Sequence, residues 1–127
     1  MVAPDLFNGT PAPSDINSPS LDINAFLAAH GPSVSDPIVA TAIKYLRSVG
    51  VKRIGSTGYC FGGRYAFRAA APGVGANVAF AAHPSLLDDG EITAAAGPAG
   101  IAAAGESSCS SHISCHVSSP HVGSAWS

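Results

Sequence analysis

The chain has 127 residues and a mass of 12.6 kDa, enough for one small domain with a modest hydrophobic core. Hydrophobic residues make up 46% of it and charged residues only 11%, a balance that favours a globular protein with a buried sheet over a disordered chain. Six Lys and Arg against eight Asp and Glu give a net charge of -2, which provides no basic stripe for nucleic-acid phosphates and no polybasic patch for anionic lipids. We therefore expect neither nucleic acid nor a membrane as a partner.

Targeting and cysteine usage both favour the cytoplasm. The sequence has no apolar run long enough to span a bilayer, and its first residues lack the basic and apolar regions of a signal peptide. The three cysteines are an odd number, and one of them lies in a glycine-rich motif, which argues for a reducing compartment and free thiols.

The N-terminal third predicts a strand end, a loop and a short helix. Residues 1–4 read as the tail of an apolar strand, and residues 5–20, with Asn8-Gly9 and three prolines, read as an exposed loop. Asp22 is a good N-cap for a helix with an apolar stripe, and Gly31-Pro32 would end that helix. The stripe consists of Ile23, Phe26 and Leu27.

A longer helix is predicted next. Asp36 reads as its N-cap, Pro37 as its first helical residue and Gly50 as its end. Its apolar residues at helical spacing are Val39, Ala42, Ile43, Leu46 and Val49.

The middle of the chain predicts an α/β fold. Residues 51–58 and 77–82 read as strands that are apolar on both faces, and residues 62–71 read as a helix between them. Alternating strands and crossover helices are typical of a parallel sheet flanked by helices. Residues 91–96 predict one or two helical turns, and residues 99–104 a last strand.

The C-terminal residues 107–127 are rich in serine and have no apolar periodicity, which predicts a disordered low-complexity tail after a folded domain of residues 1–106. Two cysteines and two histidines in this tail could in principle bind zinc, but they lack a Cys-x-x-Cys pair and a core to fix them. These residues are Cys109, His112, Cys115 and His116. We expect no metal site and no cofactor.

The strongest functional motif is Gly58-Tyr59-Cys60-Phe61-Gly62-Gly63. A strand, a nucleophile two residues after a glycine and a helix that starts at once form the G-x-nucleophile-x-G turn of α/β-hydrolases, whose tight packing requires small neighbours. The helix N-terminus favours the thiolate of Cys60, and the Phe61 N–H could bind the oxyanion of a tetrahedral intermediate. The alternative is a buried, inert cysteine with glycines that serve helix packing.

Two further residues are candidates for a substrate pocket. His83 follows a strand and should lie at the sheet edge that carries Cys60, although it could simply bind backbone there. Arg64, in the first turn after the motif, could contact an anionic substrate group or lie on the surface. Asp5, Asp88 and Asp89 suit turns or helix caps, so none is assigned as a catalytic acid.

Three segments together resemble the dienelactone hydrolase family, especially its fungal members: residues 2–7, residues 58–64 and residues 82–85. The resemblance implies a partial α/β-hydrolase fold and hydrolysis of small-molecule ester or lactone bonds by a cysteine, histidine and aspartate triad. Only Cys60 is carried over by motif, because the family's aspartate and histidine follow the nucleophile and no segment here is recognisable as either. We expect the chain to be a truncated fragment of such a protein.

Two hypotheses follow for function. The first is a hydrolase of the dienelactone hydrolase type with Cys60 as nucleophile, nearly inactive without a recognisable base and acid. The alternative is a non-catalytic or redox-sensing protein in which Cys60 is a reactive thiol, a role that needs no triad.

Overall fold

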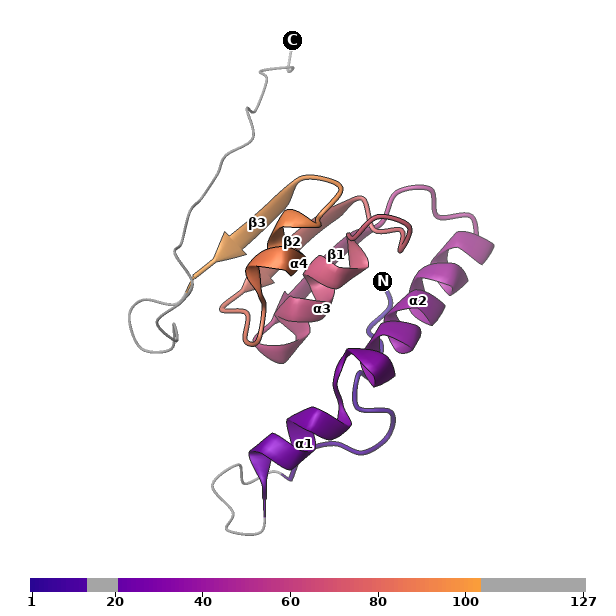
Figure 1. Cartoon of the computed structure of the whole chain (residues 1–127). Helices are drawn as coiled ribbons and strands as arrows, with labels where there is room; N and C mark the ends of the chain where they lie inside the picture. Colours follow the sequence, from indigo (N-terminus) through magenta and orange to yellow (C-terminus); the bar gives the residue numbers. More distant parts are fainter. Residues whose placement is uncertain (14–20, 104–127) are drawn as a thin grey trace.

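A computed structural model of the chain describes residues 1–13 and 21–103 (Figure 1). Three strands form a parallel sheet in the order β1 (Gly55–Tyr59), β2 (Val78–Ala82) and β3 (Ala99–Ala102). The register pairs Tyr59 with Ala82, and Ala82 with Ala102. The predicted α/β class, a parallel sheet flanked by helices, is confirmed, while the tail predicted for residues 107–127 lies outside the described residues.

Two helices lie on one face of this sheet (Figure 1). The crossover helix α3 (Phe61–Ala69) connects β1 to β2, and the short α4 (Asp89–Thr93) precedes β3. The N-terminus of α4 has a capping box, because the Asp88 carboxylate accepts the Glu91 N–H and the Glu91 carboxylate accepts the Asp88 N–H. This cap starts α4 two residues before the predicted helical turns.

The N-terminal helices differ from the prediction at their junction. Asp22 caps α1 (Ile23–Ala29) as predicted, accepting the N–H groups of Asn24 and Ala25. However, Gly31 is the N-cap of α2 (Pro32–Ser48), so Pro32 starts a helix rather than following one, and Pro37 lies inside it. Proline suits the first position because its missing N–H would be unbonded there anyway. Asp36 therefore does not cap a helix, and its carboxylate binds Arg68 on α3.

Two predicted strand segments are not strands in the described structure. Residues 1–4 are exposed and in no element. β1 begins at Gly55 rather than at Val51, because a side chain takes over the pairing just before it: Ile54 donates its N–H to the Asn77 side chain at 2.9 Å and accepts the Asn77 N–H at 2.7 Å. The first register pair of the ladder comes directly after this contact.

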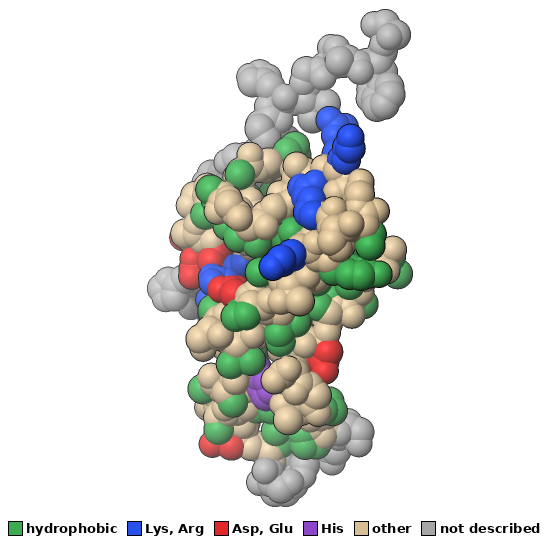
Figure 2. Space-filling view, turned by 90° about the vertical axis from the view of Figure 1, so that its right-hand side faces the viewer, with side chains coloured by type: hydrophobic (Ala, Val, Ile, Leu, Met, Phe, Trp, Pro, Cys, Tyr) green, Lys and Arg blue, Asp and Glu red, His purple; other side chains and the backbone are tan. Residues whose placement is uncertain are grey.

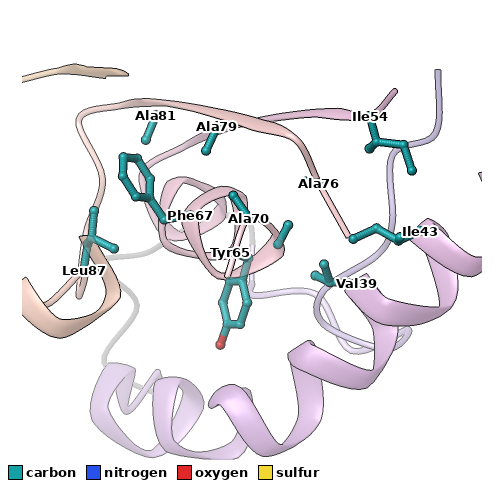
Figure 3. Packing of buried hydrophobic residues seen from close by; sticks show 11 residues of the cluster. Val39, Ile43, Ile54, Tyr65, Phe67, Ala70, Ala76, Ala79, Ala81 and Leu87 are labelled. Atoms are coloured by element: carbon teal, nitrogen blue, oxygen red, sulfur yellow. The ribbon is translucent and has the colours of Figure 1, made fainter. Parts of the chain in front are cut away.

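The core lies between the sheet and α3, and continues to α2 (Figure 3). Phe67 of α3, 1% exposed, packs toward the small buried residues Ala79 and Ala81 of β2. Val39 and Ile43 of α2 close the other side of the cluster. Alanines on the sheet thus let α3 approach closely, and the fully buried ring fills the space.

The opposite face of the sheet is exposed and, as predicted for strands that are apolar on both faces, it carries large apolar side chains. Tyr59, Val78 and Phe80 point to this face and are 68%, 44% and 47% exposed. The reason is that α3 and α4 both lie on the other side. Seen from the side of α2, the surface mixes hydrophobic, basic and acidic side chains (Figure 2). In the part of the chain that the structure describes, no helix is long and apolar enough to cross a membrane.

Candidate active site

The turn between β1 and α3 holds Cys60 in a strained backbone conformation. Its φ of 48° and ψ of -118° are sparsely populated by residues with a side chain, at a cost of about 1–3 kcal/mol. Two backbone hydrogen bonds hold this conformation: the Cys60 N–H donates to Ala82 O at 3.1 Å, and the Gly63 N–H donates to Cys60 O at 3.0 Å. The turn therefore has the sharp strand-to-helix geometry that the motif predicts.

Two of the three glycines in the motif are required by close packing. A Cβ at Gly58 would lie 2.2 Å from the backbone oxygen of Gly62, and a Cβ at Gly63 would lie 2.9 Å from Pro84 Cβ. A Cβ at Gly62 would meet no described atom within 4 Å. The prediction that all three positions must be small is thus right for Gly58 and Gly63 and wrong for Gly62.

The Cys60 thiol is exposed at this turn, and a serine lies beside it. Its Sγ is 3.5 Å from Ser85 Oγ, and the Ser85 N–H donates to Cys60 O at 3.0 Å. Ser85 thus contacts both the side chain and the backbone of Cys60. The cysteine is therefore exposed, not buried as in the alternative interpretation, and its reactivity stays a prediction.

The Phe61 N–H, which the sequence predicts as an oxyanion donor, lies at the start of α3. Phe61 is the first residue of α3, and the first N–H groups of a helix have no partner within it. Its ring packs between two others, with centroids 5.1 Å from Phe7 and 5.0 Å from Tyr65. This packing holds the Phe61 ring between the N-terminal loop and α3.

His83 lies next to the turn but does not bind the thiol. It directly follows β2, is exposed, and donates its N–H to Ala102 O at 2.7 Å. Its ring centroid is 6.1 Å from that of Tyr59, the residue before Cys60. His83 therefore lies at the sheet edge where it was predicted, and its role in a pocket stays a prediction.

Arg64 is part of an ion-pair network on the flank of α3. Its Nε donates to both carboxylate oxygens of Glu91 at 2.9 Å, and Glu91, whose side chain is 8% exposed, also binds Arg68. The hydrogen bond from Arg68 to Asp36, with a further one to Glu91, raises the pKa of the Arg68 guanidinium, which stays charged. Arg64 is thus already paired with Glu91, and its contact with a substrate anion stays a prediction.

This network borders a cavity of about 520 Å³ between α2, α3 and α4. The described residues that line it include Asp36, Arg64, Arg68 and Glu91, but neither Cys60 nor His83. Arg64 thus lines this cavity, whereas the other candidates lie at the carboxyl edge of the sheet: Cys60, Phe61 and His83.

The sequence interpretation missed Ser85. A signal for it existed, because the chain leaves β1 and β2 at the same edge of a parallel sheet, so residues that follow the two strands are neighbours. The side chain that reaches the thiol could not be read from that rule, since it depends on the turn after β2. Cys109, His112, Cys115 and His116 lie outside the described residues, so the expectation about metal stays untested.

Sequence comparisons match most of the chain to known proteins. The profile of the dienelactone hydrolase family matches residues 1–109. Hydrolase pyvD of Aspergillus violaceofuscus is 42% identical over 107 residues, which cover 84% of this chain and 43% of that protein. Hydrolase tropI of Talaromyces stipitatus is 38% identical over 114 residues, which cover 82% of this chain and 44% of that protein. The chain spans less than half the length of these curated relatives, and no solved structure matches it.

Proposed function

Because the chain belongs to the dienelactone hydrolase family, we propose that it acts in the hydrolysis of small-molecule ester or lactone bonds, with Cys60 as the nucleophile. The observation that best supports this proposal is the strained turn that presents the Cys60 thiol to solvent at the N-terminus of α3. Both relatives are named hydrolases, which agrees with the reaction class.

The proposed reaction proceeds through an acyl-enzyme. The Cys60 thiolate attacks the carbonyl carbon, and the carbonyl oxygen becomes an oxyanion to which the Phe61 N–H donates. The intermediate then collapses, the ester C–O bond breaks, and the leaving alkoxide takes up a proton. Water attacks the resulting thioester, which releases the carboxylic acid and restores the thiol.

We expect slow turnover from the 127-residue chain itself. Among the described residues, the hydrogen-bond partner of the thiol is Ser85, and neither His30 nor His83 bonds to it. General acid–base catalysis typically contributes about 10²–10⁴ in rate, and because no base is bonded to the thiol among the described residues, we expect the attack of water on the thioester to be the slow step. An acyl group on Cys60 should therefore form and persist.

The test is to trap that acyl group. The purified chain is mixed with p-nitrophenyl acetate, quenched in acid and digested with trypsin, which cuts after Arg53 and Arg64 and isolates Cys60 in the peptide Ile54–Arg64. We expect a burst of about one nitrophenolate per chain and an acetyl group on Cys60, located by tandem mass spectrometry.

Two variants serve as controls. Cys60→Ala should abolish the burst, and the double variant Cys109→Ala, Cys115→Ala should retain it, since it keeps only the proposed nucleophile. An unchanged burst in Cys60→Ala, or an unmodified Cys60 in the active chain, would contradict the proposal.

The redox alternative uses the same exposed thiol. Cysteine usage, which favours a reducing compartment such as the cytoplasm, is compatible with both functions. A redox sensor requires oxidation of Cys60 to a sulfenic acid by hydrogen peroxide. Rapid oxidation at micromolar peroxide, without acylation by the ester, would favour this second function.

A further inference from the structure

We propose that Ser85 is a positioning residue for the Cys60 thiolate, an inference that rests on the proposed function. Its hydroxyl fixes the direction of Sγ above the start of α3 and stabilises the negative charge before attack. Ser85 acts through Cys60 and takes no part in bond making or breaking.

The first support is the turn after β2, which brings Ser85 to the thiol. The register that pairs Tyr59 with Ala82 sets Cys60 beside His83, not beside Ser85. His83 and Leu86, on either side of Ser85, both have positive φ values, 37° and 61°. The chain thus bends twice within four residues, at an energetic cost, and the bend directs Ser85 toward Cys60.

The second support is that the turn after β2 contacts the Cys60 turn at two points besides the Ser85 hydroxyl. The Ser85 N–H donates to Cys60 O at 3.0 Å, and Pro84 packs on Gly63 so closely that a Cβ there would lie 2.9 Å from Pro84 Cβ. These contacts hold the two turns together without the hydroxyl. Among the described residues, the only hydrogen-bond partner of the Ser85 hydroxyl is Cys60 Sγ, at 3.5 Å.

The chemistry of a hydroxyl suits both states of the thiol. A serine hydroxyl both accepts and donates, so it accepts the S–H of the neutral thiol and, after rotation about its C–O bond, donates to the thiolate. The thiol proton leaves to solvent, and Ser85 keeps its own proton. Because a hydrogen bond to a charged group is about twice as strong as a neutral one, the contact favours the thiolate.

The experiment compares Ser85→Ala with Ser85→Thr in the full chain. Iodoacetamide alkylation is followed from pH 5 to pH 10 on the tryptic peptide Ile54–Arg64, so that Cys109 and Cys115 do not contribute. In Ser85→Ala we expect alkylation of Cys60 at pH 7 to slow by about three- to tenfold and its pH profile to move to higher pH. Ser85→Thr, which retains a hydroxyl, should stay within about twofold of the natural chain.

Several outcomes separate this inference from the proposed function. If the pH profile of Ser85→Ala matches that of the natural chain, or if Ser85→Thr loses as much rate as Ser85→Ala, the inference about Ser85 is overturned. Acylation of Cys60 in the natural chain would still support the nucleophile in that case. If the natural chain is not acylated but the alkylation profile of Ser85→Ala moves to higher pH, the proposed hydrolase function is rejected and the inference about Ser85 is supported. Far-ultraviolet circular dichroism of each variant confirms that the fold is intact.

Discussion

Replacing Gly58 by alanine should destabilise the fold strongly, because the added methyl group meets backbone atoms. Its Cβ would lie 2.2 Å from Gly62 O and 2.4 Å from Gly62 C, whereas ordinary contact begins at 3.4 Å. The turn would have to open by about 1.2 Å, against the hydrogen bond from Cys60 N–H to Ala82 O. Overpacking typically costs about 1–3 kcal/mol, and the rigid backbone on both sides places this case at or above 3 kcal/mol.

Gly62→Ala is the matched control, since the same methyl group meets no described atom there and alanine favours a helix over glycine by about 1 kcal/mol. Gly58→Ala should therefore lose about 3 kcal/mol of unfolding free energy relative to the natural chain, and Gly62→Ala should gain about 1 kcal/mol. The two variants should thus differ by about 4 kcal/mol. Urea unfolding, followed by circular dichroism at 222 nm, measures both. Equal stability of Gly58→Ala and Gly62→Ala would refute the close-packed turn.

Two further comparisons test strain and charge. Cys60→Gly should have a free energy of unfolding about 1 kcal/mol higher than that of Cys60→Ala, because glycine adopts a φ of 48° without steric cost. Identical urea midpoints for the two variants would mean that the turn is unstrained. Glu91→Gln should lose about 2–4 kcal/mol of unfolding free energy, since its side chain is 8% exposed and pairs with two arginines. Asp36→Asn should lose at most about 1 kcal/mol of unfolding free energy, because the Asp36 side chain is 39% exposed. A larger loss in Asp36→Asn than in Glu91→Gln, measured by urea unfolding, would contradict the greater contribution of the buried Glu91 pairs.

Local signals predicted the elements that depend on a few neighbouring residues. The cap at Asp22 and the order of strands and crossover helix are of this kind. The junction of α1 and α2 was mispredicted because Gly31-Pro32 suits a helix start as well as a helix end. Asp36-Pro37 has the local pattern of a helix cap, and the pairing of Asp36 with Arg68 could not be predicted because Arg68 lies 32 positions away and only tertiary structure brings them together.

The candidate site divides in the same way. Cys60 and the Phe61 N–H follow from a contiguous motif, so their arrangement could be predicted from spacing alone. Ser85 could not, because its approach depends on positive φ values at His83 and Leu86, neither of which is a glycine that would mark such a bend. The pairing of Arg64 with Glu91 depends in turn on the docking of α4 against α3.

The central place of β2 in the sheet has a consequence for the order in which the molecule opens. Amides of β2 are bonded between two neighbouring strands, whereas α1 has no buried residue. Hydrogen exchange should accordingly be slowest in β2 and α3 and fastest in α1. The Cys60 turn joins α3 to β1, so we expect its backbone hydrogen bonds to Ala82 and Gly63 to persist during transient opening of α1.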